Sequence, residues 1–169
     1  MVTAKIADSK SGRVERAVFG AGCFWGVESA FRSIPGVLKT EVGYAGGTLV
    51  NPTYEQVCTD TTGHAEVVAV EFDPVEVSFD QLLDVFWTNH NPTQLNRQGP
   101  DFGKQYRTVV FYADDAQRQT AEASKQRLAE SGKFTRPIVT EIVPLTNYFP
   151  AEGYHQQYLE KRGMTHCHL

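Results

Sequence analysis

A cysteine at position 23 has the surroundings that most clearly suggest chemistry. It lies in the segment 22–26 (GCFWG), directly after the apolar run 17–19. A glycine turn from a predicted strand into a predicted helix would place the Cys23 thiol at the helix N-terminus. There the helix dipole lowers the pKa of a thiol below its ordinary value of about 8.5. We therefore predict that Cys23 is a nucleophile rather than a small buried side chain, with Phe24 and Trp25 forming an apolar wall beside it.

A carboxyl group could supply the proton that the leaving atom needs when a thiolate attacks. The segment 63–66 (GHAE) opens a predicted strand, in which residues two apart share a face, so His64 and Glu66 are expected to point the same way. Burial against the sheet would favour the neutral form of Glu66 and make it a general acid. The alternative is an ordinary solvent-exposed carboxylate on a strand.

Three more polar side chains lie beside turns or in a long loop. Tyr44 precedes an Ala-Gly-Gly turn and Tyr106 follows the loop 93–105, so either hydroxyl could donate a hydrogen bond to a developing oxyanion. Asp101, in a Gly-Pro-Asp-Phe-Gly turn, could hold a substrate amide or cap the turn backbone. Taken alone, each of the three is also a common structural residue.

The other two cysteines have different surroundings. Cys167 lies between two histidines close to the end of the chain, where a mobile segment would let a thiol travel. We expect no metal site there, because adjacent ligands seldom share one ion and no second ligand pair has zinc-type spacing. Cys58 is predicted to serve loop packing. Three cysteines cannot all pair with one another, and a reducing cytoplasm keeps most thiols free, so we do not expect a disulfide scaffold.

Composition predicts one soluble globular domain, residues 1–169, with flexible segments at 1–12 and 163–169. Hydrophobic residues make up 41% and charged residues 21% of the chain, which is ordinary for a chain with a single core. The net charge of −4, with scattered basic residues, argues against a nucleic-acid partner. No apolar run is long enough for a signal peptide or a membrane span, so we expect a cytoplasmic monomer without membrane association.

Periodicity and turn signals predict the elements that would position these residues. Strands are expected at 14–19, 37–44, 64–72, 107–112 and 138–143, helices at 24–34, 79–90, 115–131 and 151–162, and loops at 48–63 and 93–105. Ser78 and Gln81 form a capping box, and Asp114 is expected to be an N-cap. The first six elements run βαββαβ, which predicts an α+β two-layer sandwich with a ferredoxin-like (split βαβ) core and a C-terminal extension.

Taken together, four motifs resemble those of A-type peptide methionine sulfoxide reductases: 22–26 (GCFWG), 42–47 (VGYAGG), 63–66 (GHAE), and 92–99 with 105–107 (PTQLNRQG and QYR). The resemblance runs from about Val18 to Cys167. It implies that Cys23 attacks the sulfoxide sulfur and that Glu66 protonates the oxygen. It further implies an oxygen-binding pair, Tyr44 and Tyr106, and substrate-binding residues, Phe24, Trp25, Asp101 and His64.

The resemblance also implies the rest of a catalytic cycle. A Cys23 sulfenic acid would be resolved by Cys167 to a redox-active disulfide, which thioredoxin reduces without any other cofactor. The substrates would be the S epimer of methionine sulfoxide, free and in oxidised proteins, as expected for protein repair under oxidative stress. Many relatives carry a second cysteine in a glycine-rich tail, which this sequence lacks, so we expect resolution in one step. Asn91 stands where many relatives have aspartate.

Two other function classes remain open from the sequence. In a cysteine hydrolase or acyltransferase, His64 or His155 would act as the base of Cys23, and no reductant would be needed. A non-catalytic module that binds oxidised methionine would keep its function after Cys23→Ser.

Overall fold

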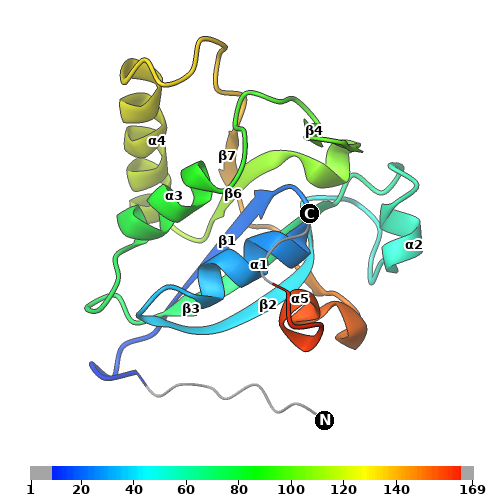
Figure 1. The fold of residues 1–169 in the computed structure, drawn as a ribbon, viewed down its shortest axis with the longest axis horizontal. Coiled ribbons are helices and arrows are strands. Elements are labelled where there is room, and N and C mark those ends of the chain that lie inside the picture. Colours follow the sequence, from blue (N-terminus) through cyan, green and yellow to red (C-terminus); the bar gives the residue numbers. More distant parts are fainter. Residues whose placement is uncertain (1–8, 165–169) are drawn as a thin grey trace.

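A six-stranded sheet forms the centre of the computed structural model, which describes residues 9–164 (Figure 1). The strand order is β7-β6-β1-β3-β2-β8, in which only β6 and β7 pair in parallel. The strands are β1 (Glu15–Ala21), β2 (Val37–Ala45), β3 (Ala65–Phe72), β6 (Thr108–Tyr112), β7 (Glu141–Pro144) and β8 (Phe149–Pro150). The order of the inner four, β6-β1-β3-β2, is that of a split βαβ arrangement, so the predicted α+β fold is confirmed.

Three longer helices pack on one face of this sheet: α1 (Phe24–Arg32), α3 (Phe79–Thr88) and α4 (Asp115–Glu130). Strand alternation explains the core, because Phe19 and its i±2 neighbours on β1 join the helices, whereas Val18 packs on the opposite face. The hydrophobic cluster on the opposite face is smaller, and Val143, Leu145 and Tyr148 pack against it.

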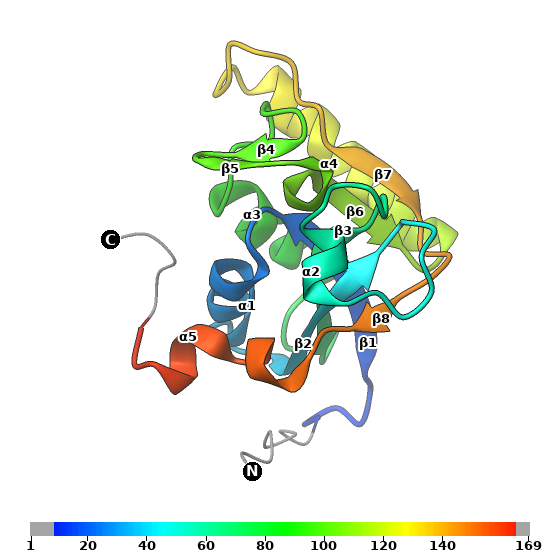
Figure 2. The same cartoon turned by 90° about the vertical axis from the view of Figure 1, so that its right-hand side faces the viewer.

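Shorter elements surround the end of the sheet at which α1 begins. They are α2 (Tyr54–Val57), η1 (Lys104–Tyr106), η2 (Gly153–His155), α5 (Tyr158–Lys161) and a two-stranded hairpin of β4 (Arg97–Gln98) with β5 (Asp101–Phe102). Figures 1 and 2 place α2 beside the N-terminal end of α1 and α5 along its side. The functional residues are therefore expected where these short elements meet α1.

The capping signals in the sequence are confirmed. Ser78 accepts a hydrogen bond from the backbone N–H of Gln81 at 3.0 Å, and the Gln81 side chain accepts one from Ser78 at 2.8 Å. Asp114 caps α4 by accepting from the N–H of Gln117 at 2.8 Å. Each cap satisfies helix N–H groups that have no partner within the helix.

The predicted loops contain structure that the sequence analysis did not anticipate. The loop 48–63 holds α2, which opens with its own capping box between Thr53 and Gln56. The loop 93–105 holds the β4–β5 hairpin. The helix expected over 151–162 is broken, because Gln157 adopts a left-handed conformation with φ of 48°. The strand expected from residue 138 begins only at Glu141.

The segment after β8 is tied to side chains of α1 and to the backbone of β2. The buried Glu28 carboxylate accepts from the backbone N–H of Gln157 at 2.7 Å and from its side chain at 3.0 Å. Gln156 bonds both backbone groups of Val42, each at 2.9 Å. The Tyr158 ring stacks on Trp25 with centroids 3.8 Å apart. This network fixes the C-terminal extension against the helix that begins at Cys23.

The two chain ends are only partly described. Residues 9–12, predicted to be flexible, form a turn in which Ser9 and Ser11 donate hydrogen bonds to Asp73 at 3.0 and 2.6 Å. The remainder of that segment and Cys167 lie outside the described residues. Within residues 9–164, no helix has both the length and the apolar character that crossing a bilayer requires. The single-domain interpretation stays a prediction.

Candidate active site

Cys23 is the residue at which the chain turns from β1 into α1. It is the N-cap of the helix, and its carbonyl accepts the N–H of Val27 at 3.4 Å. The turn requires Gly22, whose φ is +93° and whose missing Cβ leaves room for the Gln98 side chain. The thiol is half-buried and lies at the positive end of the helix dipole, as the sequence predicts.

Glu66 meets the same end of α1 from the sheet below. Its side chain is 1% exposed, and its Oε1 accepts a hydrogen bond from the backbone N–H of Phe24 at 3.2 Å. Phe24 follows Cys23 directly, so the carboxyl group and the thiol share one helix terminus. This burial excludes the solvent-exposed strand carboxylate that the sequence left open.

Tyr106 and Asp101 reach the same region from the long loop. Burial raises the pKa of Tyr106, and the neighbouring acidic groups Glu66, Cys58, Asp101 and Cys23 raise it further, which places the phenol close to all four. Asp101 and Cys23 also line one cavity of about 570 Å³, between α1 and the β4–β5 hairpin. The structure thus brings together Cys23, Glu66, Tyr106 and Asp101, which the sequence analysis had singled out separately.

Tyr54, on α2, is a site residue that the sequence analysis missed. Its ring lies 6.4 Å from the rings of both Phe24 and Trp25. Burial raises the pKa of the Tyr54 hydroxyl, and the acidic groups Glu66 and Cys58 raise it further, Cys58 also through a side-chain hydrogen bond. The capping box of Thr53 and Gln56 was the signal that could have revealed α2.

The role predicted for Tyr44 does not fit the structure. Its hydroxyl donates a hydrogen bond to Oε1 of Glu152 at 2.9 Å, and its side chain is fully buried. A phenol has one proton to donate, so Tyr44 cannot keep this bond and also donate to a substrate oxygen. Tyr54 differs in its partner, because its hydroxyl is hydrogen-bonded to the Cys58 thiol, a much weaker acceptor than the Glu152 carboxylate.

The predicted substrate contact of His64 does not fit either. The ring is 1% exposed, its Nδ1 accepts the N–H of Gly47 at 3.0 Å, and its Nε2 lies 2.7 Å from the carbonyl of Leu49. Both ring nitrogens are therefore engaged in holding the turn after β2. The period-two argument failed here because His64 lies before β3 begins, where strand alternation does not apply.

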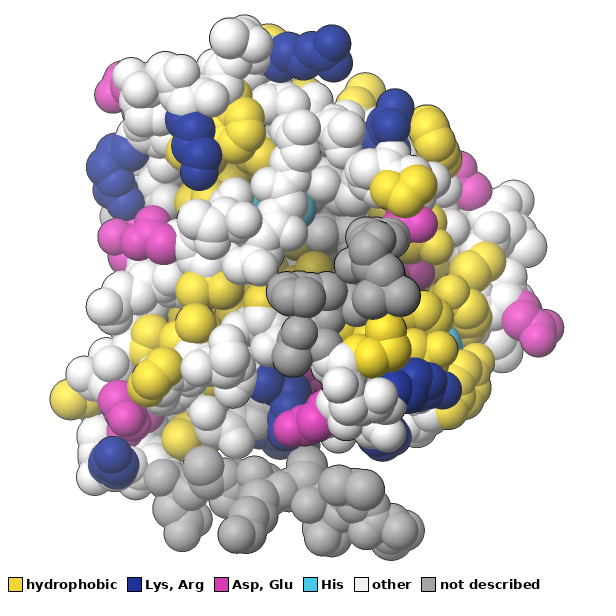
Figure 3. All heavy atoms as spheres, viewed as in Figure 1, with side chains coloured by type: hydrophobic (Ala, Val, Ile, Leu, Met, Phe, Trp, Pro, Cys, Tyr) yellow, Lys and Arg dark blue, Asp and Glu magenta, His cyan; other side chains and the backbone are white. Residues whose placement is uncertain are grey.

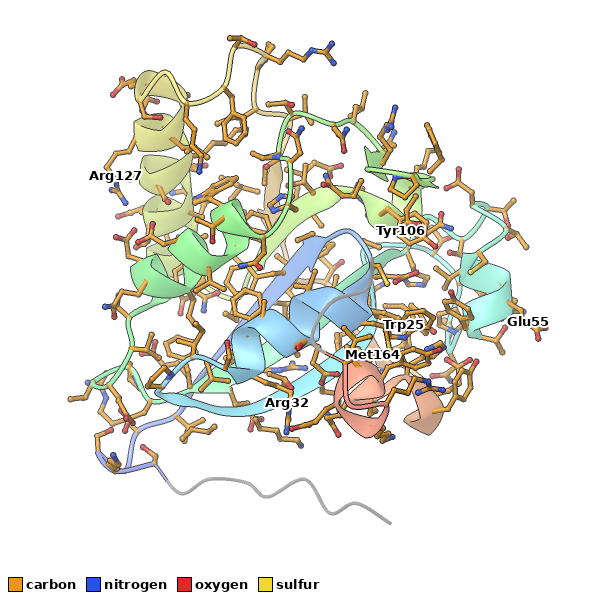
Figure 4. All side chains as sticks on the ribbon, viewed as in Figure 1. Trp25, Arg32, Glu55, Tyr106, Arg127 and Met164 are labelled. Atoms are coloured by element: carbon orange, nitrogen blue, oxygen red, sulfur yellow. The ribbon has the colours of Figure 1, made fainter. Side chains whose placement is uncertain are left out.

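Aromatic rings gather at the start of α1, directly after Cys23, where the sequence predicts an apolar wall. Phe24 is buried, whereas Trp25 is half-buried and donates from its indole N–H to Nδ1 of His155 at 3.0 Å. Figure 4 shows Trp25 between Tyr106 and Met164, and Figure 3 shows hydrophobic side chains gathered on this face, toward α2 and α5. Of the two rings, Trp25 offers accessible apolar surface for a small nonpolar group, and Phe24 supports it from the core.

The hydrolase alternative finds no suitable base. His64 is engaged as described, and His155 accepts from Trp25 while its other ring nitrogen is buried and has no hydrogen-bond partner within residues 9–164. Burial lowers the pKa of His155, which keeps the ring neutral. In His64 both ring nitrogens are already engaged, and in His155 the nitrogen nearest a donor already accepts from Trp25, so neither ring is set up as a general base. No group of three or more candidate metal ligands is found in the described part of the chain.

Asn91, the departure noted in the sequence, takes a structural role. Its Oδ1 accepts the backbone N–H and the hydroxyl of Thr93 at 3.0 and 2.6 Å. An aspartate oxygen could accept the same two bonds, so the turn does not depend on a charge at this position.

Comparisons with known proteins agree with this geometry. The family model described as "Peptide methionine sulfoxide reductase" matches residues 15–169. A protein of that name from Methanothermobacter thermautotrophicus is 61% identical over 93% of this chain and 93% of its own length. One from Geobacter sulfurreducens is 58% identical over 91% and 95% of the two chains.

Solved structures give the same result. Methionine sulfoxide reductase A of Corynebacterium diphtheriae is 41% identical over 92% of this chain and 78% of its own, with a TM-score of 0.81. Reduced Mxr1 from Saccharomyces cerevisiae is 32% identical over 96% and 93% of the two chains, with a TM-score of 0.85. These matches confirm the resemblance carried by the four sequence motifs, and the chain belongs to the A-type peptide methionine sulfoxide reductase family.

Proposed function

We propose that this protein is an oxidoreductase that reduces methionine sulfoxide to methionine, with Cys23 as the nucleophile and Glu66 as the proton donor. Family membership supports the reaction class. The observation that carries the residue assignment is the meeting of Cys23 and Glu66 at one end of α1, where the N–H of Phe24 binds the Glu66 carboxyl. A nucleophile stabilised by a helix dipole and a buried carboxyl beside it are the two groups that this chemistry needs.

The first step transfers oxygen from the substrate to the enzyme. The Cys23 thiolate attacks the sulfoxide sulfur while Glu66 passes its proton to the oxygen. The oxygen leaves the methionine sulfur and stays on Cys23 as a sulfenic acid, methionine is released as a thioether, and Glu66 is left as a carboxylate. Phe24 and Trp25 hold the methyl group, and Asp101 positions the substrate from the edge of the cavity.

Tyr54 and Tyr106 are the hydrogen-bond donors to the sulfoxide oxygen in this proposal. Glu66 acts on both phenols, and burial raises the pKa of each, which keeps them protonated. Tyr54 exchanges its hydrogen bond with the weakly accepting Cys58 thiol for one with the sulfoxide oxygen. Tyr54→Phe should slow methionine formation in a single turnover by about a hundredfold to a thousandfold, the range expected when one oxyanion donor is lost. Tyr44→Phe is the matched control and should lose much less at neutral pH. Equal losses in the two variants would contradict the assignment.

A second thiol must resolve the sulfenic acid, and we assign this role to Cys167 with a thioredoxin as the reductant. The yeast relative Mxr1 has also been solved in complex with Trx2, which supports this kind of reductant. Cys167→Ser should therefore release one methionine per enzyme and then stop when thioredoxin is the reductant. Cys58→Ser is the control, since burial raises the pKa of Cys58 and makes it a poorer thiolate. Continued cycling of the Cys167→Ser enzyme would make Cys58 the resolving thiol.

The site is expected to accept only the S epimer of the sulfoxide. The aromatic wall takes the methyl group and the Glu66 side takes the oxygen. The rest of the methionine side chain can then leave the sulfur in only one direction, which fits one epimer and not the other. Incubating each epimer of N-acetylmethionine sulfoxide with dithiothreitol tests the proposal, with methionine release expected from the S epimer alone. Equal rates for both epimers would contradict the stereochemistry. Ester or peptide hydrolysis without any thiol would support the hydrolase instead.

The cellular role follows from the same chemistry. We propose repair of oxidised proteins, together with reduction of the free amino acid, in the cytoplasm. Family membership alone does not determine the compartment, because a relative from Arabidopsis thaliana that is 54% identical is described as chloroplastic.

A further inference from the structure

Glu152 is a carboxylate that the sequence analysis did not single out. Its Oε1 accepts the Tyr44 hydroxyl at 2.9 Å, and its Oε2 accepts the backbone N–H of Tyr54 at 2.9 Å and the Tyr154 hydroxyl at 3.2 Å. Burial acts to raise the pKa of Glu152, but these hydrogen bonds outweigh burial and hold the pKa below its ordinary value. Glu152 is therefore an anion at neutral pH.

Tyr44 connects this anion to Glu66. Tyr44 and Glu66 are directly opposite each other on β2 and β3, so their side chains leave the same face of the sheet about 5 Å apart at Cβ. The far end of the Tyr44 side chain is the hydroxyl that reaches Glu152. Both carboxyl groups act on Tyr44 and on Cys58, and each raises the two pKa values beyond the effect of burial, although a hydrogen bond with Tyr54 lowers the pKa of Cys58. Glu66 and Tyr44 are buried, whereas Glu152 is half-buried, so water screens the two carboxyl groups only from the Glu152 side.

We propose that Glu152 is a positioning residue that acts through Glu66, its fixed negative charge keeping the proton on Glu66 until the sulfoxide oxygen takes it. A second negative charge beside the first is unfavourable, so the two carboxyl groups hold one proton between them, and it resides on Glu66. The inference rests on the proposed function and adds the origin of the acid to it. Glu152 neither gains nor loses a proton in the step.

The other titratable groups around the two carboxyls do not supply this charge. Burial is the main cause of the pKa shift of each of these groups. It raises the pKa of the four phenols and of Cys58, which stay protonated, and lowers that of His155, which stays neutral. The four phenols are Tyr44, Tyr54, Tyr106 and Tyr154. Cys23 is the nucleophile itself, and Asp101 acts on Tyr106. Glu55 acts on Tyr154 from the exposed side of α2, where water screens its charge.

The test is the pH dependence of sulfenic acid formation in a Glu152→Gln enzyme. Removing the charge makes ionisation of Glu66 easier, so the rate should begin to fall at a lower pH than in the wild type. We expect the alkaline midpoint to move down by about one pH unit, which is about a tenfold loss above both midpoints and little loss at pH 5.5. The Glu66 carboxyl signal in glutamate labelled with ¹³C at Cδ, assigned with Glu66→Gln, should move its titration in the same direction.

A control variant and a second measurement keep the inference falsifiable. Glu55→Gln removes an equal charge from the exposed side of α2, where Figure 4 shows Glu55 pointing away from Trp25 and Tyr106, and should leave the midpoint in place. If Glu152→Gln does not fold, the same ¹³C titration of the wild-type enzyme decides the question: Glu152 should ionise first and Glu66 at a clearly higher pH, and the reverse order overturns the inference. A folded Glu152→Gln enzyme slowed equally at every pH, or one with an unmoved midpoint, overturns the inference. The proposed function would still stand if Cys23 and Glu66 variants lost activity.

Discussion

Replacing Cys23 with serine is expected to abolish methionine formation from methionine sulfoxide with any reductant, a loss of more than about a thousandfold. A helix dipole lowers the pKa of a thiol enough to give thiolate near neutrality, whereas a serine hydroxyl at the same N-cap stays protonated. Serine also cannot form a sulfenic acid. Chromatography of methionine released in the presence of dithiothreitol measures the effect directly.

Cys58→Ser is the matched control for this substitution. It removes an exposed thiol next to the same cluster of acidic groups and should leave the dithiothreitol-supported rate nearly unchanged. Methionine release by the Cys23→Ser enzyme at a comparable rate would end the assignment of the nucleophile. If the biological effect of the protein survived Cys23→Ser intact, the protein would be a binding module instead of an enzyme.

The second large effect is expected from Glu66→Gln. A positioned general acid contributes about a hundredfold to ten-thousandfold, so the first reductive step should slow by about that much near pH 8. The loss should shrink toward pH 5.5, where solvent protons partly replace the missing internal acid. Glutamine keeps the size and the acceptor oxygen for the N–H of Phe24, so the change isolates the proton. Rapid-quench measurement of methionine in a single turnover gives the rate at each pH.

Glu71→Gln is a suitable control on the same strand. Glu71 lies five residues further along β3, in register with Lys39 on β2 and Arg16 on β1, and the odd spacing puts it on the opposite face from Glu66. Its removal should not alter the single-turnover rate. If Glu66→Gln also left the rate unchanged at every pH, the proton would have to come from another group.

Local signals in the sequence predicted much of the fold. The capping box at Ser78 and the alternation in β1 and β3 depend on neighbours within a few residues, which a sequence displays directly. The motif around Cys23 likewise encodes its own turn, because a glycine before a helix start is a local requirement. These parts are confirmed, apart from one or two residues at element ends.

The parts that were missed depend on contacts between distant residues. Tyr44 looked like an oxyanion donor because nothing near it in sequence reveals Glu152, which lies 108 residues away. The break at Gln157 in the helix expected over 151–162 is held by a hydrogen bond to Glu28, 129 residues away. Tyr54 was hidden because α2 has only four residues, too few to show helical periodicity. Candidate reactive residues were therefore easier to predict from the sequence than the distant residues that hold them in place.

The hydrogen bond from the N–H of Phe24 to Glu66 has a consequence for the balance of charge during the reaction. Before the step the anion is the sulfur at the N-terminus of α1, and afterwards it is the carboxylate bound to that same terminus. One partial positive pole therefore faces one negative charge throughout, and the protein need not reorganise around a charge that appears or vanishes. The oxygen atom moves from the substrate to Cys23 while the negative charge at the N-terminus of α1 stays the same.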